Sequence, residues 1–149
     1  MTLSYDTFAA AFLAKVSEYD MLEMQHTERQ EVIDGYLKAA VTMFRKNCKY
    51  DFFTTQDDVE RTFLTEVAED DADELVDIIS EGMVMQWMKP FLYRQENLEN
   101  LLNTRDFTTY SPANLLQKIG EAYKRVQRDY IQMIREYSYN HGDLTVLHL

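Results

Sequence analysis

The sequence predicts an all-α protein, a helical bundle of about five helices with a long C-terminal helix and an extended C-terminal arm. The long helix is predicted by SPANLLQKIGEAYKRVQRDYIQMIREY, residues 111–137, which carries the most complete set of helix signals in the chain. Other segments repeat apolar residues at steps of three and four, as helices with one buried face do. No internal repeat, low-complexity tract or proline-rich linker divides the chain, so we expect a single domain over residues 1–149.

Two helices are expected in the N-terminal third. Ser4 can accept hydrogen bonds from the free N–H groups at the start of a helix that runs to about Val16. Thr27, followed three residues later by Gln30, is a capping-box pattern and predicts a second helix that ends near Arg45. The apolar residues of this second helix form one stripe, which indicates a buried face: Val32, Ile33, Tyr36, Leu37, Ala40, Val41 and Phe44.

The middle of the chain is acidic and has weaker helical signals. Asp57 and Asp58 predict a short helix through Leu64, because carboxylates favour the positive end of a helix dipole. The acidic run in residues 69–74 predicts the solvated start of a further helix for the same reason. A calcium loop is the alternative interpretation, but the run lacks the glycine and the distal glutamate that such a loop needs.

A third helix is predicted from Asp73 to Met88, where methionines beside a tryptophan favour core packing over an adaptable binding surface. Gly82 in its middle costs about 1 kcal/mol relative to alanine, so we expect it to permit close approach of another backbone. Pro90 disfavours helical geometry in the residue before it, which predicts a break and a new helix after Lys89.

The long helix begins with Ser111 as a cap and Pro112 at the first helical position. Its apolar seam predicts packing against other helices: Leu116, Ile119, Tyr123, Val126, Tyr130, Met133 and Tyr137. Because a buried phenol needs a partner or water for its hydroxyl, the tyrosines favour an interface with wet edges. Gly142 is the expected stop. Basic residues off the seam predict a solvated face, or one that meets the acidic half of a neighbouring copy: Lys118, Lys124, Arg125, Arg128 and Arg135.

The C-terminal segment, residues 144–149, is partly apolar on both faces of an extended chain. Two interpretations remain open: an arm that adds as a strand to a neighbouring subunit, and a segment that folds back over its own helices. The residues expected at a protein interface are Trp87, Tyr123, Tyr130, Tyr137, Leu144, Val146 and Leu147.

Composition favours a protein partner. The chain has 26 acidic and 15 basic residues, a formal charge of −11, which disfavours sequence-independent binding to nucleic acid or to anionic lipid. Residues 1–75 carry most of this charge, with 17 acidic and 7 basic residues. No apolar run approaches the roughly 20 residues that cross a bilayer, so no membrane partner is expected. The single cysteine, Cys48, fits a reducing compartment and is expected to be a buried spectator thiol.

No pattern in the sequence indicates catalysis. His26, His141 and His148 are scattered and have no metal-ligand spacing with Cys48, so no zinc is expected. No nucleophile lies in a strand-to-helix elbow, and four glycines leave no phosphate-cradling loop. We therefore expect neither an enzyme nor a cofactor nor a small-molecule substrate.

The C-terminal half contains blocks that are similar to a known kind of protein. ENLENLLNTRDF, the YSPANLL helix start and the tyrosine-rich ending before GDL resemble small structural proteins of tailed phages of Gram-positive hosts, the neck or head–tail connector components. The resemblance begins near Glu74. It implies a helical subunit repeated as a ring under the portal, found in the virion and in the host cytoplasm during assembly, with no catalytic residues.

An acidic phage-encoded regulator that binds a host protein, by imitating the charge of nucleic acid, is the alternative function. The acidity of the chain fits both the connector and the regulator, since a negative lining lets DNA pass through a neck channel without holding it. Ring formation by the purified protein, alone or with a portal, discriminates between them.

Overall fold

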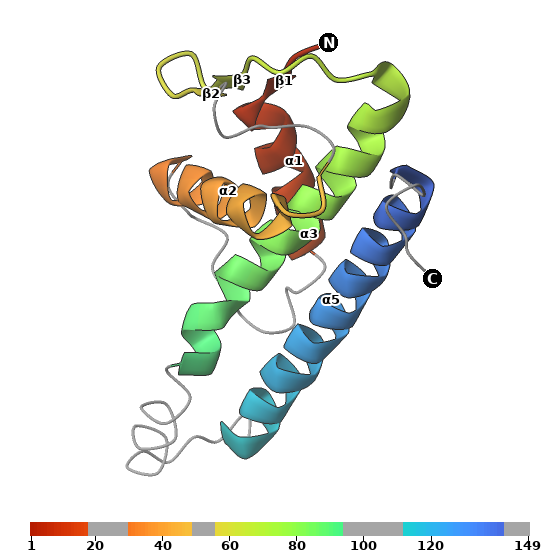
Figure 1. The fold of residues 1–149 in the computed structure, drawn as a ribbon. Coiled ribbons are helices and arrows are strands. Elements are labelled where there is room, and N and C mark those ends of the chain that lie inside the picture. The colour runs from red at the N-terminus through yellow and green to blue at the C-terminus, as the bar shows by residue number, and fades with distance from the viewer. Residues whose placement is uncertain (18–29, 49–55, 94–111, 142–149) are drawn as a thin grey trace.

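The computed structural model describes residues 1–17, 30–48, 56–93 and 112–141, and these are mostly helical (Figure 1). Their four helices are α1 (Tyr5–Val16), α2 (Gln30–Phe44), α3 (Glu69–Tyr93) and α5 (Pro112–His141). Three two-residue strands, β1 (Leu3–Ser4), β2 (Gln56–Asp57) and β3 (Thr62–Phe63), form an antiparallel sheet in the order β1-β3-β2. The predominance of helix confirms the predicted class, and the small sheet is an addition to it.

Helix α3 is the centre of the fold. The other three helices make their most extensive contacts with it, and Figure 1 shows α5 running alongside α3. Six large side chains of α3 are almost wholly buried: Leu75, Ile78, Ile79, Met83, Trp87 and Met88. Ser80, Val84 and Met85 are buried too, so α3 is buried over most of its circumference here, with Asp77 exposed and Glu81 half-buried on the remaining side. Core packing of the methionines beside the tryptophan is thereby confirmed.

Helix α1 begins as the sequence predicts. The Ser4 hydroxyl accepts a hydrogen bond from the backbone N–H of Asp6 at 3.2 Å, which caps the first turn. Phe8 and Phe12 are buried on the inner face of α1. The ring of Phe12 meets the Trp87 ring edge-on with centroids 6.3 Å apart, so aromatic packing joins α1 to α3.

Helix α2 buries most of its predicted stripe. The buried residues are Ile33, Leu37, Ala40, Val41 and Phe44. Val32 is exposed and Tyr36 is half-buried, so the stripe is narrower than predicted. The expected cap, Thr27, lies outside the described residues.

The predicted helix through Leu64 is wrong, because residues 56–63 form a hairpin of β2 and β3. The Asp57 carboxylate accepts the N–H groups of Val59 and Glu60 at 3.0 and 3.2 Å, bonds that shape a turn as readily as a helix start. The side chain of Phe63 is then buried against Tyr5, with ring centroids 4.8 Å apart. This contact joins the hairpin to α1.

Arg61 fastens the hairpin to two helices. Its backbone has a φ of 54°, in the left-handed region that L residues rarely adopt. Its guanidinium donates two hydrogen bonds to Asp34 of α2, at 2.7 and 2.9 Å, and one to Asp6 of α1 at 2.6 Å. The planar guanidinium suits this paired recognition of a carboxylate, so one side chain holds three segments together.

Helix α3 is longer at both ends than predicted, and the predicted break at Pro90 is wrong. The helix starts at Glu69 inside the acidic run, where exposed carboxylates favour its positive end, and this agrees with the solvated start expected there. It continues through Pro90 to Tyr93. Proline removes only one helical hydrogen bond, and the buried side chains of Trp87 and Met88 hold the preceding turn in place.

Helix α5 confirms the predicted seam for the residues whose side chains are described. Ile119, Val126, Tyr130 and Tyr137 are buried, and Tyr123 and Met133 are half-buried. The helix ends at His141, directly before the predicted stop. The rest of the helix expected after Lys89, beyond Tyr93, and the arm in residues 144–149 fall outside the described residues.

Gly82 lies where three helices meet. A Cβ built at this position would lie 3.2 Å from the Cβ of Ala40 in α2, 3.2 Å from Cε2 of Tyr130 in α5 and 3.3 Å from Cε of Met43. These distances are shorter than ordinary van der Waals contacts. The predicted close approach at this glycine is therefore found, although side chains rather than another backbone make it.

We expect Gly82→Ala to lower the free energy of unfolding by about 1–2 kcal/mol, because overpacking outweighs the gain in helix propensity. Gly35→Ala is the matched control: Gly35 is exposed in α2 with nothing within 4 Å of an added Cβ, so this change should stabilise by about 0.5–1 kcal/mol. Urea unfolding of both variants measures the difference. Equal stability of the two would show that the three helices separate easily at Gly82.

Candidate interaction surfaces

The structure places most of the predicted interface residues that it describes in the core. Trp87 and Tyr137 are buried, and Tyr130 is only 5% exposed, so these three pack inside the chain's own core and not on its surface. They fill the spaces around α3, because aromatic rings bury the most apolar area per residue. Tyr123 is half-buried. An interface role for Tyr123, and for Leu144, Val146 and Leu147 outside the described residues, stays a prediction.

The outward side of α5 carries a stripe of cations, which we call the basic face: Lys124, Arg128 and Arg135, together with Gln127, Ile131 and Gln132. These six residues line a shallow depression of about 300 Å³. Ile131 is 41% exposed in the middle of the stripe. Lys118 and Arg125 are exposed as well, so the prediction that the basic residues lie off the seam is confirmed.

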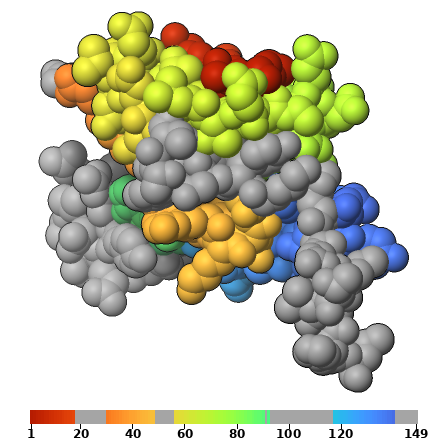
Figure 2. All heavy atoms as spheres, turned by 45° about the horizontal axis from the view of Figure 1, so that its top comes forward, coloured from red at the N-terminus to blue at the C-terminus, as the bar shows by residue number. Residues whose placement is uncertain are grey.

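The opposite charge gathers at another part of the molecule, which we call the acidic end: the hairpin tip with Val59 and Glu60, then Leu64, Glu66, Glu69 and Asp70. Figure 2 shows the hairpin, the N-terminus and the start of α3 side by side on one surface. Val59 is 89% exposed and Leu64 is 57% exposed among these carboxylates. Glu66 accepts a hydrogen bond from the N-terminal amine at 2.8 Å. Both groups are solvated, so this ion pair is weak and the acidic end keeps its negative character.

Asp58 links the acidic end to the helices. Its carboxylate accepts a hydrogen bond from the Tyr5 hydroxyl at 2.8 Å and lies 3.1 Å from the Lys38 ammonium. These two partners hold the pKa of Asp58 below its usual range, the bond from Tyr5 being the larger effect. Burial and the neighbouring carboxylates raise the pKa of Tyr5, so its hydroxyl stays protonated and keeps donating.

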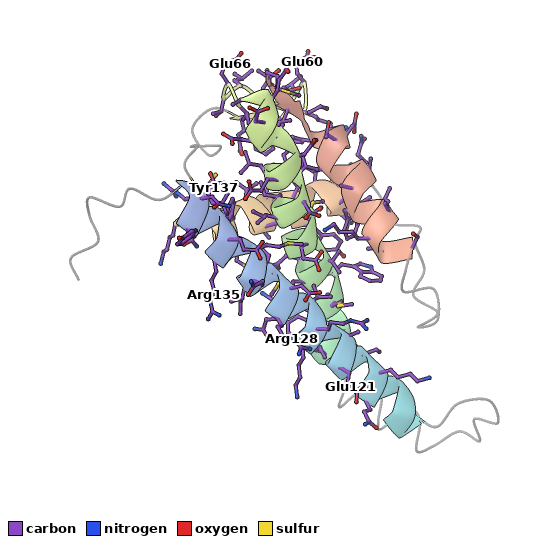
Figure 3. The ribbon with its side chains drawn as sticks, turned by 90° about the vertical axis from the view of Figure 1, so that its right-hand side faces the viewer. Glu60, Glu66, Glu121, Arg128, Arg135 and Tyr137 are labelled. Atoms are coloured by element: carbon purple, nitrogen blue, oxygen red, sulfur yellow. The ribbon has the colours of Figure 1, made fainter. Side chains whose placement is uncertain are left out.

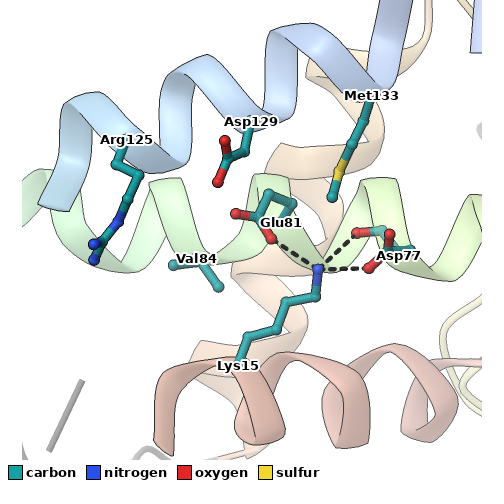
Figure 4. A pocket seen from close by; sticks show the side chains of 7 residues that line it. All are labelled: Lys15, Asp77, Glu81, Val84, Arg125, Asp129 and Met133. Carbon is teal, nitrogen blue, oxygen red and sulfur yellow. Dashed lines mark hydrogen bonds and ion pairs between the residues drawn. The ribbon is translucent and has the colours of Figure 1, made fainter. Parts of the chain in front are cut away.

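A groove of about 560 Å³ separates α1 from α5 above α3 (Figure 4). Lys15 of α1 reaches into it and donates hydrogen bonds to Asp77 and Glu81 of α3, both at 2.7 Å. Burial opposes the charge on Lys15, but its two carboxylate partners prevail and raise its pKa above the ordinary value. Arg125 and Asp129 line the α5 side. The arrangement is an ion-pair link between helices and contains no activated nucleophile.

The described residues hold no arrangement that suggests a metal centre or a membrane span. Among them, no three His, Cys, Asp or Glu side chains gather closely enough to bind a metal ion. None of their helices is long and apolar enough to cross a bilayer. Cys48 is half-buried beside the core, which corrects the expectation of a buried thiol, because it follows the last turn of α2 at the edge of the packed helices.

No protein-family model, no curated protein and no solved structure matches the chain. The surfaces themselves are therefore the guide to function. Sequence reasoning identified the cations of the basic face, but it missed the exposed Val59, Leu64 and Ile131 between the charges. Ile131 carried one usable signal, since it lies one position beyond Tyr130 and thus outside the strict seam.

We expect Lys15→Met to lower the free energy of unfolding by about 1–3 kcal/mol, because it leaves Glu81, which is 12% exposed, without its cation. Adding Glu81→Met should recover much of the loss, since an apolar pair of similar size removes the uncompensated charge. Lys38→Met is the control: its pair with Asp58 is solvated and is worth less than about 1 kcal/mol. Thermal unfolding measures all three variants. If the double variant is no more stable than Lys15→Met, the loss of stability does not come from the uncompensated charge of Glu81.

The Tyr130 hydroxyl is buried without a hydrogen-bond partner among the described residues. Tyr130→Phe should therefore stabilise the protein, by about 1 kcal/mol at neutral pH. Burial raises the pKa of Tyr130 to about 12, so the unfolded chain loses this proton near pH 10 while the folded chain keeps it. Because the unfolded chain binds fewer protons than the folded chain in this range, the free energy of unfolding falls as pH rises from about 10 to about 12.

Denaturant midpoints from pH 7 to pH 12 test the idea. The gain in free energy of unfolding of Tyr130→Phe over the parent should be constant up to about pH 10 and should increase above it. A variant less stable than the parent at every pH would show that the hydroxyl has a hydrogen-bond partner.

Proposed function

We propose that the chain is a virion structural protein, a subunit of a phage head–tail connector ring that binds the portal or neighbouring neck and tail proteins. The resemblance of the C-terminal half motivates this proposal. The observation that carries it is the position of α5, a helix of 30 residues, about 45 Å long, that packs mainly on α3 along one side. Its other side exposes cations that make no ion pair with another described residue: Lys124, Arg125, Arg128 and Arg135.

A surface of this kind suits assembly better than catalysis. A long, outward helix face offers many contacts to a protein partner without requiring a cleft, and charge complementarity fixes the register of such contacts. The same chain also presents an acidic end, so it has two unlike surfaces. Contacts between unlike surfaces build closed rings when the rotation per subunit divides a full turn, which is the symmetry of a connector.

The net charge of −11 fits a component of a DNA channel. A subunit that attracted many phosphates would hold the genome in place, whereas a negative subunit lets it pass. The acidic end also supports the second candidate, a phage-encoded regulator that binds a host protein by imitating the charge of nucleic acid. Its exposed carboxylates, Glu60, Glu66, Glu69 and Asp70, are the observation that favours it.

Virion composition and assembly state distinguish these functions. We expect the chain in purified virions, in host lysates during assembly, and as rings in electron micrographs after mixing with purified portal. A charge-matched control protein mixed with the same portal sets the background. A chain that is missing from intact virions and stays monomeric with portal is not a connector subunit. A stable complex with a host nucleic-acid-binding protein under those conditions would favour the regulator.

A further inference from the structure

We infer that two copies of this chain associate head to tail, with the hairpin tip of one copy seated on the basic face of α5 in the next. The inference deepens the connector proposal and rests on it for its biological setting. Its physical grounds are independent of that setting: complementary charge, paired exposed aliphatic residues and a rigid hairpin.

The basic face has the composition of a docking surface, and the described residues of its own chain leave it exposed. Lys124, Arg128 and Arg135 lie at steps of four and seven along α5 and therefore share one side of the helix. None of the three makes an ion pair with another residue of the described segments. Ile131 lies between them and gives the depression an aliphatic floor with a cationic rim.

The hairpin tip has the matching composition. Val59 is the most exposed of the large apolar side chains at the acidic end, and the carboxylate of Glu60 follows it directly. An aliphatic side chain excludes water best against another aliphatic group, while a carboxylate pairs with a guanidinium in a defined geometry. Val59 against Ile131, with Glu60 beside Arg128, satisfies both requirements at once.

The hairpin is rigid before it binds. Asp57 accepts the N–H groups of Val59 and Glu60, and the Arg61 side chain ties the end of the turn to Asp34 and Asp6. A loop held in this way loses little conformational freedom on association, so a small contact gains affinity. The acidic end thus presents its two contact residues on a fixed scaffold.

The two surfaces cannot satisfy each other within one chain. Figure 3 shows Glu60 at one end of the molecule, whereas Arg128 and Arg135 point outward from α5 well away from it. A hairpin tip seated on the basic face therefore belongs to a second copy. Because the contact joins unlike surfaces, a pair of copies still has one free acidic end and one free basic face. Further copies can therefore add at both ends until the assembly closes into a ring.

Charge repulsion between copies does not prevent this contact. Each copy carries a net charge of −11, but salt screens interactions beyond about 10 Å at 0.1 M ionic strength. Pairs in direct contact survive this screening better than the long-range repulsion does. One hairpin against one helix face is a small interface, so isolated subunits should associate weakly and mainly at high concentration.

Sedimentation of the full chain over a wide concentration range at 0.1 M salt tests the inference. We expect the average mass of the parent protein to rise with concentration. Arg128→Glu, which destroys the basic face, and Glu60→Lys, which destroys the acidic end, should each weaken association at least tenfold. Lys46→Glu and Glu31→Lys are the matched controls, because they change the charge by the same amounts at exposed positions outside both surfaces; they should associate like the parent.

Mixing the two disabled variants gives the decisive outcome. In an equal mixture the intact basic face of Glu60→Lys meets the intact acidic end of Arg128→Glu, and the two reversed charges are also opposite in sign, so both contacts can form. We expect the mixture to associate, whereas each variant alone associates at least tenfold more weakly than the parent. Circular dichroism of each variant confirms that it is folded.

A parent chain that is monomeric at all concentrations, or charge reversals that leave its association unchanged, would overturn the inference. Virion content and portal binding are measured separately, so a connector subunit that assembles through other surfaces would still be recognised. A chain absent from virions would instead refute the connector proposal and leave the measured self-association in place.

Discussion

Enclosure of α3 by the other helices is the constraint on which the rest of the structure depends. Helix α2 and helix α5 approach α3 at the same level, where the missing side chain of Gly82 admits both Ala40 and Tyr130. Because a close-packed interior cannot take up an extra methyl group without a shift, the separation of these helices is fixed at that point. The direction in which α5 turns its basic face follows from this contact.

A second constraint acts at the acidic end. The left-handed backbone of Arg61 is unfavourable by about 1–3 kcal/mol for a residue of this kind, so the surrounding contacts must compensate for it. The guanidinium compensates through its hydrogen bonds to Asp34 and Asp6. These bonds raise the pKa of Arg61, and the bonds to Asp34 have the larger effect. One cation in an acidic region thus determines the shape of the hairpin and the direction of Val59 and Glu60.

The sequence predicted the helices whose signals are local. The Ser4 cap and the Tyr123–Val126–Tyr130 spacing of the seam lie within a few residues of the features they determine, so pattern reasoning finds them. The hairpin was not predicted, because the Asp57 carboxylate can accept hydrogen bonds from the backbone of a turn or from that of a helix start. Only partner residues distant in the sequence decide which of the two structures forms. Phe63 against Tyr5 is such a partner, some sixty residues away along the chain.

The candidate site was harder to predict than the fold, for a related reason. An aromatic residue carries the same sequence signal whether it fills a core or an interface, and Trp87 and Tyr137 proved to be core residues. Charged residues are less ambiguous, since an unpaired charge is almost never buried, and the cations of α5 were placed correctly.

The use of aromatic residues in the core also determines what kind of recognition remains to the surface. With Trp87 and the buried tyrosines enclosed, the described surface offers charges, a few isolated aliphatic side chains such as Val59 and Ile131, and the exposed ring of Tyr139. A surface of this composition binds weakly one contact at a time, and its affinity falls as salt rises. Such contacts become stable when many are made together, because linking binding events converts later ones into intramolecular steps. In the ring that we propose, each copy would make several such contacts at once, and this would supply that condition.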